Sequence, residues 1–105
     1  MKKSLWKPSE ERIKNSLLED FSKFVGFKSN NNFKKIWKWS VTKPEVFWSK
    51  FWDYSKIIGD KGKVVIKKNK IFNKTKFFPD SKINYAENIL KKKNNDIAIH
   101  FLSEK

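Results

Sequence analysis

The side chains that most often carry out catalysis are scarce in this sequence. There is no cysteine, and His100 is the only histidine. A thiolate nucleophile, a disulfide and a Cys/His zinc site are therefore excluded. Asp53 and Glu87 lie on separate predicted helices, without a second acid at a spacing suited to general acid–base catalysis. A lone histidine in an apolar run is typical of a core or interface position, so we predict no catalytic and no metal-binding residue.

A phosphate-binding loop is not expected either. The chain has three glycines, Gly26, Gly59 and Gly62. They are too few and too far apart to bring several backbone N–H groups to one phosphate. We therefore predict no cofactor-binding residue.

Aromatic residues make up 16% of the chain and suit binding or packing rather than catalysis. At helical spacing Phe47 and Phe51 share one stripe, while Trp48 and Trp52 lie on a neighbouring flank. This is more apolar surface than one helix of a small domain usually contributes to its own core, so we infer that the helix contacts a second body as well. An aromatic-rich core of a small independent protein is the alternative.

Caps and periodicity predict helices in the first part of the chain. A first helix is predicted over 9–26, with a serine N-cap and a glycine C-cap. Asn31 or Asn32 is expected to cap a short second helix. Thr42, with Glu45 three residues later, has the spacing of a capping box at the start of a central helix that ends near the Gly-Asp-Lys-Gly run.

The second part of the chain predicts a smaller β component. Residues 63–67 and 71–72 are expected to form a hairpin. Residues 77–78 precede a proline, which favours an extended backbone that presents both rings. A capped helix is predicted over 84–90, and the apolar run 97–102 predicts a strand buried on both faces. The fold class is therefore mainly α with a small β component (α+β).

The formal net charge of +14 indicates an attraction to polyanions, but not a specific nucleic-acid site. Arg12 is the only arginine among 25 basic residues, whereas specific binders favour arginine for bidentate contacts. We read the scattered lysines as a solvated surface. The chain has no apolar run long enough to span a membrane and no signal peptide pattern, so we predict a cytoplasmic location, no membrane partner and no specific nucleic-acid partner.

Three segments resemble one protein family: residues 5–13, residues 39–41 together with 44–48 and 52–53, and residues 77–90. They are similar to the N-terminal region of acetoacetyl-CoA synthetases, which are ATP-dependent ligases of the adenylate-forming superfamily. The most specific part is Asn84-Tyr85-Ala86-Glu87-Asn88, followed by two aliphatic residues.

The resemblance implies a helical N-terminal domain over 1–95, followed over 96–105 by the start of an adenylation domain whose first strand is 97–102. The full enzyme would convert acetoacetate, ATP and CoA to acetoacetyl-CoA, AMP and pyrophosphate, with magnesium. None of the catalytic motifs of the family occurs here, so the isolated chain is predicted to be inactive and to bind no cofactor. It would be an N-terminal fragment or a split gene product.

A docking role follows from the resemblance together with the aromatic excess. The predicted partner is the adenylation domain of an acyl-CoA synthetase, and the predicted docking surface is formed by four aromatic side chains: Trp48, Trp52, Phe77 and Phe78. The two alternatives are a stand-alone α+β interaction module and a lysine-rich, weak nucleic-acid binder.

Overall fold

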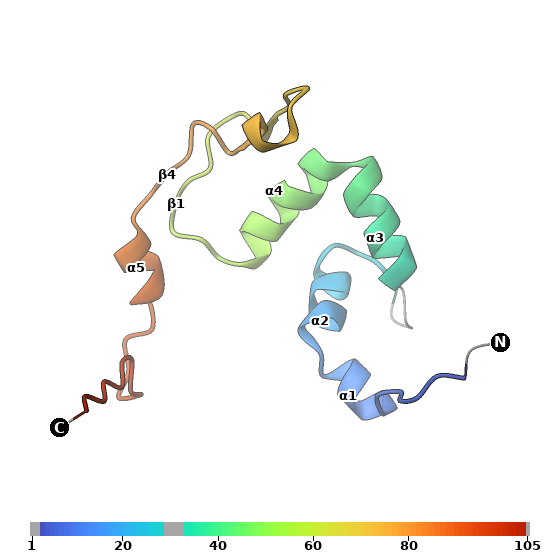
Figure 1. Ribbon diagram of the computed structural model, residues 1–105, viewed down its shortest axis with the longest axis horizontal. Helices are drawn as coiled ribbons and strands as arrows, with labels where there is room; N and C mark the ends of the chain where they lie inside the picture. The colour runs from blue at the N-terminus through green and yellow to red at the C-terminus, as the bar shows by residue number, and fades with distance from the viewer. Residues whose placement is uncertain (1–2, 29–32, 105) are drawn as a thin grey trace.

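The helices and short strands follow one another along an open arc (Figure 1). The computed structural model describes residues 3–28 and 33–104. Within these ranges it contains α1 (Glu10–Lys14), α2 (Leu17–Phe24), α3 (Phe33–Thr42), α4 (Pro44–Tyr54), β1 (Gly59–Asp60), β2 (Ile66–Lys67), the 3₁₀ helix η1 (Phe72–Lys74), β3 (Lys76–Phe77), β4 (Lys82–Ile83) and α5 (Tyr85–Ile89). The prediction of a mainly helical chain with a small β component is confirmed.

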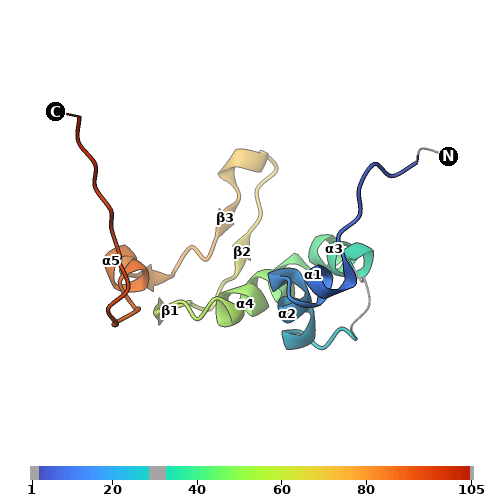
Figure 2. The ribbon, with the colours of Figure 1, turned by 90° about the horizontal axis from the view of Figure 1, so that it is seen from below.

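The arc is far less compact than a globular domain of the same length. Its radius of gyration is 18.4 Å, against about 13 Å for a compact domain of 100 residues. Its accessible surface is 10262 Å², against about 6,200 Å² for a compact monomer of this mass. In the view from below, the hairpin of β2 and β3 rises from the layer of helices, as do the two terminal segments (Figure 2). No helix in the described ranges is long and apolar enough to cross a membrane.

The prediction of one helix over 9–26 is wrong, because two helices occupy that stretch. Ser9 caps α1 as expected, its Oγ accepting a hydrogen bond from the Arg12 N–H at 3.2 Å. Ser16 then takes an extended backbone and caps α2 in the same way, accepting from the Glu19 N–H at 3.2 Å. A second serine cap inside the apolar period therefore divides the helix.

The expected end of the first helical region at Gly26 is confirmed. Gly26 has a φ of +88°, and the Phe27 N–H donates to the Ser22 carbonyl at 2.9 Å. This is the Schellman arrangement, which a glycine favours because it has no Cβ. Phe27 in turn packs on Trp39 of α3, with ring centroids 5.5 Å apart.

The predicted capping box at Thr42 is wrong. Thr42 is the last residue of α3, and its Oγ1 donates back to the Lys38 carbonyl at 2.8 Å. The residue that precedes α4 is Lys43, which makes no capping hydrogen bond through its side chain. Pro44 disfavours a helical backbone at the residue before it, so Lys43 forms a one-residue joint between α3 and α4. The central helix also ends earlier than expected, at Tyr54. Asn31 and Asn32, the predicted caps before α3, lie outside the described residues.

Strand pairing differs from the predicted hairpin. β2 pairs with β3 in antiparallel register, Ile66 opposite Phe77 and Lys67 opposite Lys76. Ile71 and Phe72, predicted as the second strand, belong instead to the turn that contains η1. The second sheet joins β1 to β4. Phe78 was predicted to be extended but has a φ of +46°, with its N–H donating to the Val65 carbonyl at 2.7 Å.

The last part of the described chain holds one confirmed helix start and one apolar run that forms no strand in the chain by itself. Asn84 caps α5, its Oδ1 accepting from the Glu87 N–H at 3.1 Å. The run 97–102 forms no strand, since no neighbouring strand offers it backbone partners. Ile97, Ile99, Phe101 and Leu102 are each more than 80% exposed, and His100 is exposed with them rather than in a core.

Candidate docking surface

The four predicted docking residues lie together, in two ring pairs that join α4 to the β2–β3 region. The rings of Trp48 and Phe77 lie 5.4 Å apart at an edge-on angle of 66°. The rings of Trp52 and Phe78 lie 4.9 Å apart and tilted by 49°. Aromatic pairs at these distances are favourable beyond the area that they bury. The structure therefore brings these four side chains together as two contacting pairs, each with one ring from α4 and one from the end of the hairpin.

Their exposure differs strongly within the group. Trp52 is 8% exposed and belongs to the core, with Ile66 of β2 also 8% exposed. Phe77 is 51% exposed, and Trp48 and Phe78 are partly exposed. Trp52 is thus a buried contact of Phe78, whereas about half of the Phe77 surface is exposed to solvent.

A salt bridge fixes the polar side of α4 beside this surface. Lys61 Nζ lies 2.7 Å from Asp53 Oδ1 and donates to Ser49 Oγ at 3.0 Å. The two charged side chains retain 25% and 48% of their accessible area, so the pair is screened and positions the segment more than it stabilises it. The segment after β1 is thereby held against α4.

A second apolar surface, not foreseen from the sequence, runs between α2, α3 and α4. It is a groove of about 600 Å³, which we call the apolar groove, lined by Leu17, Leu18, Phe21, Phe33, Ile36, Trp37, Ser40, Phe47, Phe51, Tyr54 and Ser55. Leu17 is 79% exposed, and Phe33 and Trp37 are each 59% exposed. Large apolar side chains gathered in one exposed area are unusual for a monomer.

The floor of the apolar groove is Phe21, which is 6% exposed. Its ring contacts four others, with centroids 5.1–6.5 Å away: Trp39, Phe47, Phe51 and Tyr54. The helical period of α2 already placed Phe21 on an apolar face. Its role as the centre of three helices depends on the angle between α3 and α4, which the sequence pattern did not predict.

Polar side chains of the groove offer little chemistry. The Tyr54 hydroxyl donates to Asp20 Oδ2 at 2.9 Å, and this hydrogen bond raises the pKa of Tyr54 above its ordinary value. Over residues 3–28 and 33–104, no three acidic or histidine side chains gather in a way that could hold a metal ion. The Asp53 carboxylate pairs with Lys61, and Glu87 takes part in the cap of α5 through its backbone N–H.

These features describe a small helical unit with two partly exposed aromatic surfaces. Residues 33–89 match the family described as acetyl-coenzyme A synthetase N-terminus. The match covers more than half of the chain, which therefore belongs to this family.

Similar proteins give a more specific relationship. The acetoacetyl-coenzyme A synthetase of Rhizobium meliloti (strain 1021) is 29% identical over 103 residues, which cover 95% of this chain and 16% of that protein. The acetoacetyl-CoA synthetase of Gallus gallus is 33% identical over 106 residues, covering 95% and 16%. That of Danio rerio is 33% identical over 108 residues, covering 97% and 16%. The chain corresponds to the N-terminal region of these synthetases and spans about 16% of the length of the curated relatives it matches. No solved structure matches it.

Proposed function

We propose that the chain is the N-terminal docking segment of an acetoacetate:CoA ligase, and that it packs on the adenylation domain without supplying catalytic residues. The ligase would join acetoacetate to CoA with ATP and magnesium, releasing AMP and pyrophosphate. In this proposal those ligands bind to the adenylation domain. The chain contributes stability and position.

The observation that carries the proposal is the exposed apolar run 97–102, which follows α5 and pairs with no strand among the described residues. Its Ile97, Ile99 and Phe101 are 82%, 81% and 81% exposed. Alternate apolar side chains on an extended backbone suit addition to the sheet of a partner, where backbone groups and both faces find contacts. In this proposal that partner is the adenylation domain of the ligase.

The aromatic surfaces support the same proposal. In this proposal Phe77 and the exposed parts of Trp48 and Phe78 contact the partner, and the buried Trp52 packs against Phe78. A stand-alone module would expose little apolar surface, so the apolar area that this chain exposes favours docking.

The test is reconstitution with a relative. A Gallus gallus synthetase that lacks its own N-terminal region is mixed with the chain, and its melting temperature is measured as a function of chain concentration. Docking predicts a rise that saturates, because a ligand that binds only the folded state stabilises it.

Variants locate the contact. Phe77→Asp should reduce the rise, since it places a charge in the proposed interface, whereas Phe72→Ser, on the far end of the hairpin, should leave it unchanged. No rise at saturating chain, with helical content intact by circular dichroism, would reject the docking role.

A further inference from the structure

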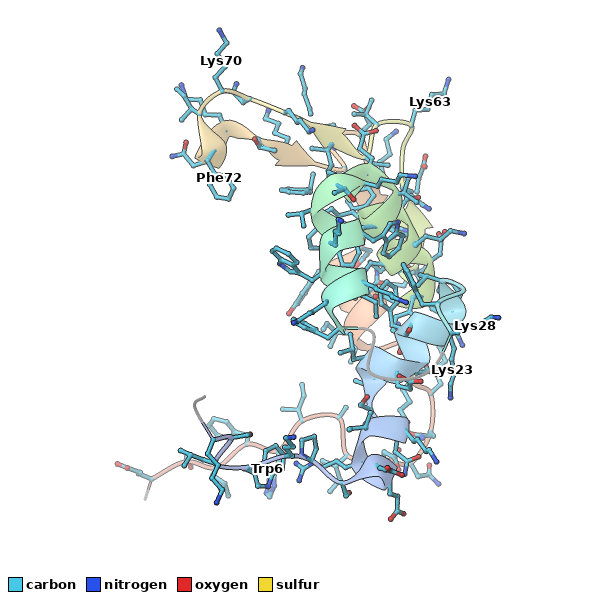
Figure 3. All side chains as sticks on the ribbon, turned by 90° about the vertical axis from the view of Figure 1, so that its right-hand side faces the viewer. Trp6, Lys23, Lys28, Lys63, Lys70 and Phe72 are labelled. Atoms are coloured by element: carbon cyan, nitrogen blue, oxygen red, sulfur yellow. The ribbon has the colours of Figure 1, made fainter. Side chains whose placement is uncertain are left out.

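The β2–β3 hairpin, residues 66–77, holds two apolar side chains out in solvent at its tip. Phe72 is 92% exposed and Ile71 is 52% exposed. Local hydrogen bonds fix this turn: the Ile71 N–H donates to Asn69 Oδ1 at 2.9 Å, and the Asn69 N–H donates to Thr75 Oγ1 at 3.2 Å. Phe72 lies at the end of the hairpin, to one side of the helices, and its ring points to the opposite side of the tip from Lys70 (Figure 3). The tip is therefore an ordered turn that presents apolar groups.

Lysines surround the tip without acidic neighbours. The hairpin lysines are Lys67, Lys68, Lys70, Lys74 and Lys76. Residues 61–79 contain no aspartate or glutamate, and none of the hairpin lysines forms an ion pair with a described carboxylate. Lys67 lies directly opposite Lys76 in the ladder, an arrangement that destabilises a strand pair because like charges face each other. Four of them, with Asn69 and Asn73, line a hollow of about 490 Å³.

We propose that this hairpin binds the surface of membranes that contain anionic lipids, with Phe72 and Ile71 entering the headgroup region. Lysines near an anionic leaflet each strengthen binding, by roughly fivefold per residue at low screening. An apolar tip gains further by leaving water. The bound state would also relieve the repulsion between Lys67 and Lys76. This function is independent of docking on an adenylation domain.

The composition of the tip favours a lipid surface over a nucleic acid. Single-stranded nucleic acid is bound by flat rings on which bases stack, a contact that Ile71 cannot make. The hairpin has no arginine for bidentate phosphate contacts, whereas lysine acts as a compact charge that needs no fixed geometry. The expectation of no membrane partner rested on the lack of a spanning segment, which does not bear on attachment to a surface.

The experiment is flotation of the full chain with phosphatidylcholine vesicles, with and without phosphatidylglycerol, at physiological ionic strength. Replacing all five hairpin lysines by glutamine should weaken binding to the anionic vesicles by at least about tenfold. The matched control replaces five exposed lysines of the helical region by glutamine: Lys14, Lys23, Lys34, Lys35 and Lys38. It lowers the net charge equally and should change binding by no more than about twofold.

A second pair of variants tests the apolar tip. Phe72→Ser should weaken binding by about fivefold, and Leu5→Ser, at a fully exposed position elsewhere, should leave it unchanged. Equal losses in the two lysine variants would overturn the proposal by showing a diffuse effect of charge. So would full binding by Phe72→Ser, or an RNA oligonucleotide that displaces the chain from vesicles and itself requires Phe72.

Discussion

The side-chain amide of Asn88 forms two hydrogen bonds with the backbone of Ile58. Its Oδ1 accepts from the Ile58 N–H at 2.8 Å, and its Nδ2 donates to the Ile58 carbonyl at 2.9 Å. The amide thus pairs with Ile58 as a strand residue would, immediately before β1. Because Asn88 lies in α5, this pairing anchors α5 to the segment that follows α4.

Removing the Asn88 amide should release α5 from this anchor. Asn88→Ala loses both bonds and should lower the free energy of unfolding by about 1–2 kcal/mol. Asn88→Asp keeps the acceptor but sets a carboxylate against the Ile58 carbonyl, so it should be comparably destabilised at neutral pH and recover partly in acid, where the carboxyl can donate. Amide hydrogen exchange at Ile58 measures the effect. Unchanged protection at Ile58 in Asn88→Ala would contradict it, and Asn73→Ala, at an exposed position, is the control.

Replacing Gly59 or Gly26 by alanine should lower the free energy of unfolding by different amounts. At Gly59, with φ at +149°, a Cβ would lie 2.6 Å from the Lys82 carbonyl oxygen and 2.6 Å from Ile83 Cγ2. Gly59→Ala should therefore separate β1 from β4 and cost more than about 2 kcal/mol. At Gly26, with φ at +88°, a Cβ would meet nothing within 4 Å, so Gly26→Ala should cost only the backbone strain, about 1 kcal/mol. Thermal unfolding followed by circular dichroism compares the two, and equal losses would show that the close approach at β4 is unimportant.

Ser22 offers a stabilising substitution. It is 2% exposed, and its hydroxyl has no hydrogen-bond partner among the described residues. A buried, unpaired hydroxyl costs free energy, and alanine also has the higher helix propensity. Ser22→Ala should raise the free energy of unfolding by about 0.5–1 kcal/mol, measured by urea titration. Ser40→Ala is the comparison, because its hydroxyl donates to the Trp37 carbonyl at 2.7 Å. A loss of stability in Ser22→Ala would mean that its hydroxyl is satisfied after all.

The sequence predicted those features that depend on residues within one turn. Ser9 and Asn84 were identified as caps because an N-cap needs only the residues that follow it. Thr42 had the same spacing to Glu45, yet a threonine at the end of one helix can also bond backward, and the proline at 44 set the helix start instead. Local spacing alone did not distinguish the two cases.

Features that depend on distant partners were not predicted. The strand over 97–102 requires a neighbour for its backbone groups, and the pairing of β2 with β3 rather than with 71–72 required knowing the length of the turn. The candidate site shows the same limit. The helical period marked Trp52 as an apolar position, but its burial depends on contact with Phe78. Phe78 follows the hairpin and has a positive φ, which the sequence did not predict. Long-range contacts of this kind leave no local pattern.

The Tyr54 hydroxyl gives stability that depends on pH. Its hydrogen bond to Asp20, followed by partial burial and the charge of that carboxylate, raises the pKa of Tyr54 above 10.0 in the folded chain. A pKa that is higher in the folded than in the unfolded chain contributes stability that is fully present below about pH 10 and is lost as the pH rises through the folded value. The melting temperature of the native chain should therefore exceed that of Tyr54→Phe at pH 7–9, and the difference should vanish in stronger alkali.

The chain has two tyrosines, so Tyr85→Phe leaves Tyr54 as the only phenol. Titrating the ultraviolet absorbance of the phenolate in Tyr85→Phe then measures the pKa of Tyr54 directly. Every other side chain is common to the native chain and Tyr54→Phe, so the difference in melting temperature isolates the hydroxyl. A phenol midpoint at or below 10, or a difference that persists in alkali, would mean that Asp20 does not hold the Tyr54 proton.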